Sequence, residues 1–278
     1  MGRERLVNLR SKWLQMIEDV SFRKLINNSE CPEKLKYDFN KNGELKHVDT
    51  NEPFVFNYQN SYNHKCYRIL GQLITQYVFE LLEKVCSLQK IYIPTCMADS
   101  KICSFFFMSK NALTNRSGDV LCRPLGTEIQ HGSQIPFITT ALKCSWGVIV
   151  LNPNDNFVDL KIEPEYLSLL ENDAICPLNL SWAVLKRNSS NLKEHTTYVW
   201  YHFILKTSSR NVAFIAHGYE GLIFINLLMQ RTLEVMNKVY AVALIDSKHH
   251  MKHQTQGNSE VQTWIWKHCQ EWVLKVSL

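Results

Sequence analysis

The stretch from Asn211 to Gly221 constrains the fold of this chain more than any other part of the sequence. It reads Asn-Val-Ala-Phe-Ile-Ala-His-Gly-Tyr-Glu-Gly, and a second apolar run follows from Leu222 to Met229. An uninterrupted short apolar run, a glycine-containing turn and a longer apolar segment predict a buried strand, a sharp turn and a buried helix. The fold must therefore provide neighbouring strands for the first segment and cover for the second.

Apolar runs of strand length and of helix length alternate along the second half of the chain. The expected order is strand 147–153, helix 195–206, strand 211–217, helix 222–235, strand 239–245 and helix 261–276. Such alternation predicts parallel strands joined by right-handed helical crossovers. We therefore expect an α/β fold with a doubly wound, mostly parallel sheet and helices on both faces. Because no strand is predicted after the last helix, we expect the sheet to be incomplete at its C-terminal edge.

The first half of the chain predicts a hairpin, a long helix and antiparallel strands. Asn42-Gly43 lies between short alternating runs, which is a strong hairpin signal. Apolar residues recur at steps of three and four from Tyr67 to Leu82, so one face of a helix there should be buried. The remaining elements are an antiparallel sheet edge at 91–93 and 102–108, a short strand at 120–122 and a helix at 133–145.

We expect the chain to have two parts. Residues 1–30 can form an amphipathic helical segment, since their apolar residues recur at helical spacing. The apolar face would carry Leu6, Leu9, Trp13, Met16 and Ile17. Residues 31–278 would then form a single α/β domain, with a polar and irregular insertion at about 155–194.

Composition limits the environment of the protein. The formal net charge of +5 comes from 31 basic and 26 acidic residues that are scattered along the chain, which is not by itself typical of nucleic-acid binding. Nine cysteines with no Cys-x-x-Cys pair indicate reduced intracellular thiols. The start of the sequence has no apolar core of secretory type, and the longest apolar runs fall far below the roughly 18 to 20 residues of a membrane span. We therefore expect neither secretion nor a membrane partner.

The turn at Gly218 occupies a position that carries chemistry in other proteins. In α/β-hydrolases the pattern small-x-nucleophile-x-small presents a serine at the tip of a strand-to-helix turn. Here the tip is Gly218, which has no side chain that could attack a substrate. The turn thus predicts a fold and argues against catalysis.

Several blocks of the sequence resemble one family and follow one another in that family's order. The blocks are Glu52 to Tyr58, Phe107 to Ser109 with Ala112 to Asn115, Gln134 to Phe137, Gly147 to Pro153 and Val239 to Ser247. They are similar to the Argonaute-binding-protein-two family, in its animal cotranscriptional-regulator branch, over roughly residues 31 to 275. The resemblance implies an α/β-hydrolase-like domain and a location in the nucleus, or otherwise in the cytoplasm. It also implies links to Argonaute proteins, to heterochromatin formation directed by small RNA, including binding of small interfering RNA, and to control of splicing.

The same resemblance indicates which catalytic parts are missing. The family's turn reads Ala-His-Ser-Tyr-Gly-Gly, whereas here Gly218 stands at the nucleophile position and Glu220 at a small-residue position. A His-Gly-Ser-Gly loop is expected after the strand near Val120, where this chain has Cys-Arg-Pro-Leu-Gly from Cys122 onward. Asp246 matches the acid position. We expect the chain to end before the loop that would carry the catalytic histidine.

We therefore expect a degenerate, shortened member of the family that is not an enzyme, needs no cofactor and acts by binding. Its vestigial catalytic positions are Gly218 and Asp246, and Asp246 should be a helix-capping or turn carboxylate. The implied partners are Argonaute, chromatin or splicing proteins, with RNA as a further candidate. Two alternatives stay open: a residual serine-type esterase, and a decayed, unstable copy that has lost a strand and presses Glu220 between strand and helix.

Four basic residues form a candidate binding surface. They fall close together in the sequence, near predicted strand ends, where open α/β sheets bind ligands. These residues are Lys101, Lys110, Arg116 and Arg123. They would line a groove for RNA phosphates, or they would simply solvate a surface.

Aromatic residues and histidines near the end of the chain have simpler interpretations. Trp264 and Trp272 fit the apolar face of the last expected helix, whereas Trp266 should be exposed and available for contact. His249 and His253 are four residues apart and would share a helix face. No third ligand accompanies them at matching spacing, so we expect a polar loop and no metal site.

Overall fold

The computed structural model describes residues 36–40, 45–55, 61–95, 102–113, 120–124, 135–161, 181–209 and 211–273. The chain divides into two compact units, the first made of Met1–Leu88 and Thr127–Thr140 and the second of Gln89–Gly126 and Ala141–Leu278. The helical segment expected at 1–30 lies outside the described residues.

The first unit contains a hairpin and a long helix. Strands β1 (Tyr37–Phe39) and β2 (Leu45–His47) pair in antiparallel fashion, and helix α3 extends over Ser61–Lys84. Phe39 stacks on Tyr77 of α3 with ring centroids 5.2 Å apart, so aromatic contact joins the hairpin to the helix. The predictions of a hairpin and of a long helix in this region are confirmed.

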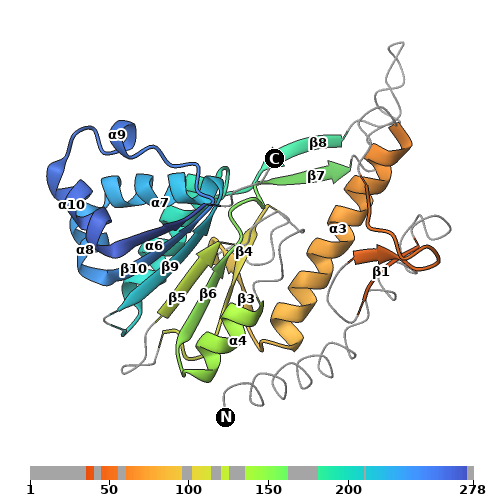
Figure 1. Ribbon diagram of the computed structural model, residues 1–278, viewed down its shortest axis with the longest axis horizontal. Coiled ribbons are helices and arrows are strands. Elements are labelled where there is room, and N and C mark those ends of the chain that lie inside the picture. Colours follow the sequence, from red (N-terminus) through yellow and green to blue (C-terminus); the bar gives the residue numbers. More distant parts are fainter. Residues whose placement is uncertain are drawn as a thin grey trace. The chain divides into compact units, whose positions relative to one another are not determined.

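The second unit is built on a seven-stranded sheet with the order β11-β10-β9-β5-β6-β4-β3 (Figure 1). Strand β4 is antiparallel to both of its neighbours, and the other pairs are parallel. The mostly parallel α/β sheet with an antiparallel edge is therefore confirmed. The strands are β3 (Gln89–Ile93), β4 (Ser104–Met108), β5 (Val120–Pro124), β6 (Gly147–Leu151), β9 (Val212–His217), β10 (Val239–Ile245) and β11 (Cys269–Trp272).

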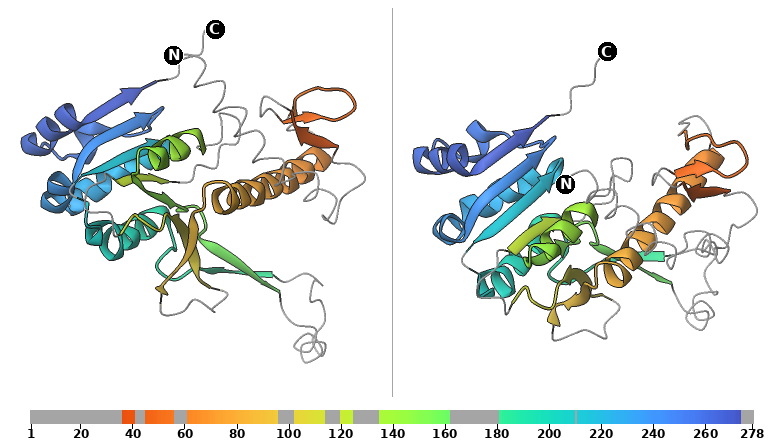
Figure 2. Two further views of the ribbon diagram at one scale, coloured as in Figure 1. Left: turned by 90° about the horizontal axis from the view of Figure 1, so that it is seen from below. Right: turned by 60° about the horizontal axis from the view of Figure 1, so that its bottom comes forward.

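Helical segments connect the parallel strands. Figures 1 and 2 show α6, α7, α8 and α10 along one face of the sheet, where they cover alternate residues of the strands. The segments are α4 (Ile135–Lys143), α6 (Leu192–His202), the 3-10 turn η3 (Ile204–Lys206), α7 (Tyr219–Gln230), α8 (Thr232–Lys238), α9 (Met251–Gln254) and α10 (Ser259–His268). Among the helices that the structure describes, none combines the length and the apolar character that crossing a membrane requires.

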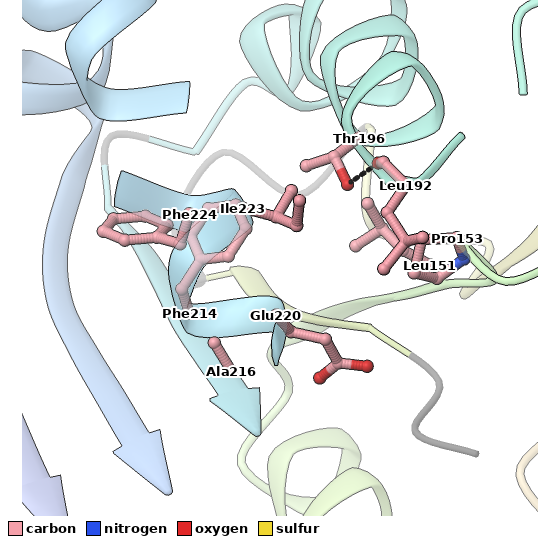
Figure 3. Close-up of a pocket in the computed structure, with 9 residues that line it drawn as sticks. All are labelled: Leu151, Pro153, Leu192, Thr196, Phe214, Ala216, Glu220, Ile223 and Phe224. Atoms are coloured by element: carbon pink, nitrogen blue, oxygen red, sulfur yellow. Dashed lines mark hydrogen bonds between the residues drawn. The ribbon is translucent and has the colours of Figure 1, made fainter. Parts of the chain in front are cut away.

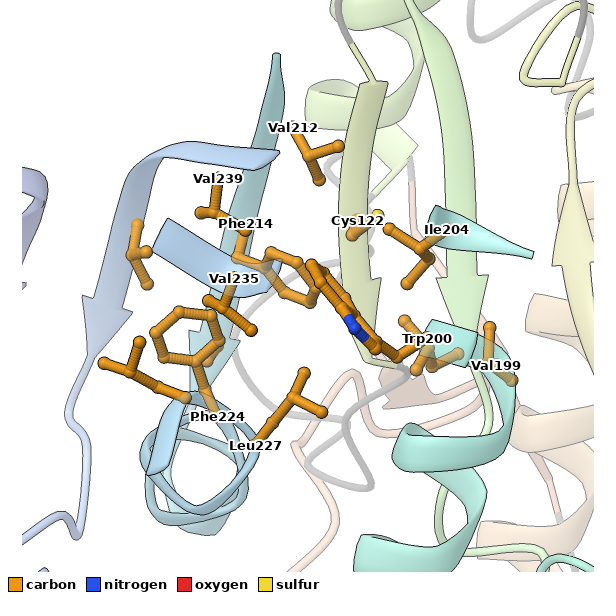
Figure 4. Packing of buried hydrophobic residues seen from close by; sticks show 14 of the residues in the cluster. Cys122, Val199, Trp200, Ile204, Val212, Phe214, Phe224, Leu227, Val235 and Val239 are labelled. Atoms are coloured by element: carbon orange, nitrogen blue, oxygen red, sulfur yellow. The ribbon is translucent and has the colours of Figure 1, made fainter. Parts of the chain in front are cut away.

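Aromatic side chains fill the space between the sheet and these helices. Trp200 of α6 lies between Phe214 of β9 and Ile204, as Figure 4 shows. The Trp200 and Phe214 rings are 6.1 Å apart, and Phe214 lies 5.2 Å from Phe224 of α7. The buried indole nitrogen of Trp200 donates a hydrogen bond to Glu234 Oε2 at 3.3 Å, so its polar atom is not left without a partner.

The C-terminal edge of the sheet differs from our expectation. The helix predicted over 261–276 ends at His268, and β11 follows it in parallel register with β10, from Val242 opposite Cys269 to Ile245 opposite Trp272. The prediction that no strand follows the last helix is wrong. The helix was predicted to continue because apolar residues continue at helical spacing. The residues after His268 instead form backbone hydrogen bonds with the edge of β10, which lies far away in the sequence and is not apparent from local spacing.

The segment expected to be an irregular insertion at about 155–194 contains regular structure. Strands β7 (Phe157–Lys161) and β8 (Ser181–Leu185) pair as an antiparallel ribbon, and α6 begins at Leu192. Asn191 caps this helix, because its side-chain oxygen accepts the Glu194 N–H at 2.9 Å. The Glu194 carboxylate in turn accepts the Ser190 N–H at 2.8 Å. This reciprocal capping fixes the helix start earlier than apolar spacing predicted.

Candidate functional site

The turn between β9 and α7 is the candidate site, and Gly218 forms its tip. Gly218 has φ 56° and ψ −121°, a conformation that favours glycine. Its N–H donates to Ile245 O at 3.0 Å, and its carbonyl accepts the Lys248 N–H at 2.9 Å. The end of β10 therefore holds the tip on both sides. A Cβ atom at position 218 would have no atom within 4 Å apart from those of its chain neighbours.

Glu220 follows the tip and is 7% exposed. Its carboxylate accepts the His217 N–H at 3.0 Å, across the turn. It also lies in the first turn of α7, where the positive end of the helix dipole stabilises an acid. The carboxylate that we expected to be pressed between strand and helix thus has a backbone partner, which offsets the cost of burying it.

Gly221 and Ser247 lock α7 to the segment after β10. A side-chain carbon at Gly221 would lie 1.8 Å from Ser247 Oγ, so the serine hydroxyl fills the space that the glycine leaves. Ser247 Oγ is 2.8 Å from His249 Nδ1, and Glu271 Oε1 of β11 is 3.9 Å from that same nitrogen. A catalytic triad needs the carboxylate on the opposite ring nitrogen from the serine. The arrangement of this serine and histidine therefore differs from that of a catalytic triad.

Asp246 lies at the turn after β10. Its backbone has φ 44°, and its N–H donates to Trp272 O at 2.7 Å. His250 and Asn258 occupy the N-cap positions of α9 and α10, and Asp246 lies in the bend after β10, which agrees with the expected helix-capping or turn carboxylate in its turn form. Within the part of the chain that the structure describes, its carboxylate has no hydrogen-bond or ion-pair partner.

Two cysteines lie on strands of this sheet, Cys122 on β5 and Cys269 on β11. Cys122 of β5 is fully buried and burial raises its pKa, while burial raises the pKa of Cys269 to about 12. Neither side chain is ionised near neutral pH, so neither is a reactive thiolate. The loop that would supply oxyanion donors, at 125–134, lies outside the described residues.

A narrow pocket lies beneath the turn, between β6, β9, α6 and α7 (Figure 3). Its volume is about 10 Å³, which is room for about one water molecule. Figure 3 shows the Glu220 carboxylate pointing away from the Phe214 and Phe224 rings. The lining residues are Leu151, Pro153, Leu192, Thr196, Phe214, Ala216, Glu220, Ile223 and Phe224.

The structure does not bring together the two described members of the basic surface. Arg123 pairs opposite Val150 near the C-terminal end of β5, whereas Lys110 follows the antiparallel β4. Ser109 N donates to Val148 O at 2.9 Å, which places Lys110 beside the start of β6. The two residues thus lie at opposite ends of the strands. Lys101 and Arg116 lie outside the described residues.

The tryptophans near the C-terminus divide as follows. Trp264 is 8% exposed in the core and Trp266 is 81% exposed, as expected. Trp272 is 53% exposed on β11, so its assignment to a buried helix face is wrong.

The two histidines considered as metal ligands lie apart in role: His249 contacts Ser247, and His253 is exposed in α9. The residues that the structure describes contain no group of three metal-binding side chains.

Sequence reasoning missed a buried polar network around His195. His195 is fully buried, its Nε2 accepts the Asn152 N–H at 3.2 Å, and its Nδ1 is 2.9 Å from Ser189 Oγ. Nearby, Lys186 forms an ion pair with Asp155 at 2.5 Å. Burial, and secondarily the charge of Lys186, lower the pKa of His195 to about 3, so the ring is neutral. The capping pattern at Asn191 and Glu194 was the available signal, since it places His195 in the first turns of a helix.

Comparison with known proteins gives consistent matches over most of the chain. A family model for the Arb2 domain matches residues 28–277. The human protein ARB2BP is 44% identical over 290 aligned positions, covering 93% of this chain and 80% of its own length. The human cotranscriptional regulator ARB2A is 37% identical, covering 87% of this chain and 69% of its own length. A Dictyostelium discoideum homologue of that regulator is 25% identical over 80% of this chain.

The lock between Gly221 and Ser247 predicts unequal effects for two helical glycines. Gly221→Ala should destabilise the protein by on the order of 1–3 kcal/mol, because the new methyl group meets Ser247. Gly71→Ala in α3 has open space around it and should stabilise by roughly 0.5–1 kcal/mol. Chemical denaturation measures both, and Ser247→Gly should recover part of the loss in Gly221→Ala. Equal effects at the two glycines would contradict the lock.

The buried His195 predicts a loss of stability in mild acid. Its pKa is lowered from 6.5 to about 3 in the folded state, so the unfolded chain binds this proton first as the pH falls. The contribution of His195 is present above pH 6.5 and is lost as the pH falls toward 3; between pH 7.5 and 5.5 it amounts to about 1 kcal/mol. Chemical denaturation at both pH values gives the change in the free energy of unfolding, which should be smaller for His195→Gln than for the unchanged chain. The exposed His253→Gln variant serves as the control and should behave like the unchanged chain. The same change for His195→Gln as for the unchanged chain would refute this role of His195.

Proposed function

Because the chain belongs to the Arb2 domain family, we propose that it is a non-catalytic nuclear regulator that acts by binding other macromolecules. Relatives of this chain are named cotranscriptional regulators, which fits a role close to chromatin or transcription. We assign Argonaute, chromatin or splicing proteins as partners, with small interfering RNA as a further ligand. The pathways in which we place it are heterochromatin formation directed by small RNA and control of splicing.

The observation that carries the non-catalytic assignment is the geometry at Gly218. The turn has the strand-turn-helix form and the positive φ of a nucleophile elbow, and an acid follows on the next strand at Asp246. This supports an α/β-hydrolase-like fold. The tip lacks an attacking group, and the arrangement of the nearby Ser247 and His249 differs from that of a catalytic triad. The neighbouring pocket has a volume of about 10 Å³, room for about one water molecule, which supports a non-catalytic role.

The esterase alternative has no support from a particular contact. In α/β-hydrolases the triad follows the chain order serine, acid and histidine. His268 is the last residue of α10, and its Nδ1 donates to Tyr240 O at 2.9 Å. His268 therefore faces the start of β10, at the opposite end of the strands from Gly218.

Restoring the serine should restore nothing. Gly218→Ser supplies a hydroxyl at the tip, but it brings neither a base nor a substrate pocket, and a serine there adopts a strained backbone conformation. Neither the unchanged chain nor Gly218→Ser should hydrolyse a short acyl ester or react with a fluorophosphonate. A control variant, Gly218→Ala, separates the effect of strain from that of the hydroxyl. Labelling at a defined residue would refute the non-catalytic assignment.

The binding role predicts capture of a defined partner class. The purified chain, immobilised at moderate salt, should recover Argonaute from a nuclear extract treated with nuclease, above the level of beads without protein. The nuclease treatment excludes recovery of Argonaute that is mediated only by a shared RNA. Recovery no greater than that of the beads would contradict the Argonaute assignment.

A further inference from the structure

One edge of the sheet in the second unit collects lysines. Each of four helical segments carries a lysine in its last turn, shortly before a parallel strand begins. These are Lys143 before β6, Lys206 before β9, Lys238 before β10 and Lys267 before β11. Lys110 reaches the same edge from the antiparallel β4. We call these five residues the lysine edge.

The strand order arranges the lysine edge as a row. Read across the sheet from β11 to β4, the residues follow in the order Lys267, Lys238, Lys206, Lys143 and Lys110. Neighbouring strands lie about 4.8 Å apart, so the row extends over roughly 24 Å. Residues far apart in the sequence thus form one linear array of positive charges.

Most of these charges are not neutralised. Lys110, Lys143, Lys206 and Lys267 are exposed, and none of them forms an ion pair with any residue that the structure describes. Lys238 is different, because its ammonium donates to Thr207 O at 2.7 Å and to Ser209 O at 2.6 Å. It holds the loop before β9, where Ser208 Oγ donates to Leu113 O at 3.0 Å. The loops carrying Lys110 and Lys206 are therefore joined.

In α8, a described acid close to the lysine edge is already engaged by other groups. Glu234, one turn before Lys238 in α8, is engaged by Arg231 at 3.9 Å and by the Trp200 indole. The opposite edge of the sheet is mixed in charge. There the acids Asp155, Glu194, Glu220, Asp246 and Glu271 accompany Lys186, Lys193 and Lys248.

Favourable interaction with helix dipoles explains part of the pattern. A lysine near the C-terminus of a helix stabilises that helix by roughly 0.3–1 kcal/mol, which accounts for Lys143, Lys238 and Lys267 individually. It does not account for Lys110, which lies at no helix end. Nor does it account for the alignment of all five residues along one edge.

We propose that the lysine edge binds the phosphate backbone of a nucleic-acid strand without reading its sequence. Lysine contacts phosphate as a point charge, and a linear row of exposed ammonium groups matches a linear polyanion. Neutralising phosphates releases counterions, so the affinity falls steeply with salt. This inference rests on the proposed binding function and assigns a surface to it. The surface differs from the groove expected at Arg123, because it lies at the other end of the strands.

The test is fluorescence anisotropy with a labelled 20-nucleotide single-stranded RNA of mixed sequence and the full chain. For four phosphate contacts, affinity should fall roughly fiftyfold between 50 and 200 mM salt. Lys206→Gln with Lys267→Gln should lower affinity at 50 mM salt on the order of tenfold and reduce the salt slope by about 1.4, at 0.7 per lost contact. Both side chains are exposed, and Lys238 is left unchanged because it supports the loop.

A matched control removes the same charge from the other edge. Lys193→Gln with Lys248→Gln should leave affinity and salt slope nearly unchanged, although the net charge is equal to that of the first pair. No binding at 50 mM salt, or equal losses for the two pairs, would overturn the proposal. Competition by polyglutamate as effective as that by an RNA of equal charge would also overturn it, in favour of an acidic protein.

The failure of this proposal can be told apart from that of the proposed function. The protein-capture experiment above uses nuclease-treated extract, so it does not depend on the lysine edge. If the unchanged chain does not bind RNA while the double variant Lys206→Gln and Lys267→Gln still captures its protein partner, the assignment of the lysine edge is rejected and the proposed regulatory role is kept.

Discussion

The hydrogen bonds that fix the β9–α7 turn to the end of β10 determine how this structure is organised. Gly218 donates to Ile245 and accepts from Lys248, and Glu220 closes the turn through the N–H of His217. These contacts set the angle at which α7 leaves the sheet. That angle in turn brings Phe224 against Phe214 and lets Trp200 complete the core. The turn is held as firmly as a catalytic elbow needs to be, although it carries no nucleophile.

The chemistry of such a turn and its architecture have separate physical requirements. Nucleophilic catalysis requires several groups to converge on one reacting atom, and Gly218 brings no side chain to that point. The fold requires only backbone hydrogen bonds and packed apolar surface, which glycine does not disturb. The partner found for Glu220 and the presence of β11 remove two reasons for regarding the chain as a decayed copy. A turn built in this way can keep its architecture whether or not it carries a nucleophile.

The sequence predicted most of the sheet because several of its strands are continuous apolar runs. The strand from Val239 to Ile245 was predicted to the residue, since it is such a run and is bounded by the polar residues Lys238 and Asp246. Prediction failed at Cys269–Trp272, where strand pairing depends on a free neighbour far away in the sequence. It failed also for Ser247, since no sequence pattern tells that a hydroxyl will occupy the space above Gly221. The lysine edge shows the same limitation: its members are dispersed in the sequence and become a row only through the strand order.

Native-state hydrogen exchange at the turn tests the central claim most directly, because it measures how firmly the hydrogen bonds of the turn are held. The amides of His217, Gly218 and Lys248 each donate to a partner across the turn. We expect them to exchange only through unfolding of the whole second unit, with the same free energy of opening as the buried amides of β9. Exchange at the rate of an unstructured peptide would show that the turn is not held, and would contradict this account.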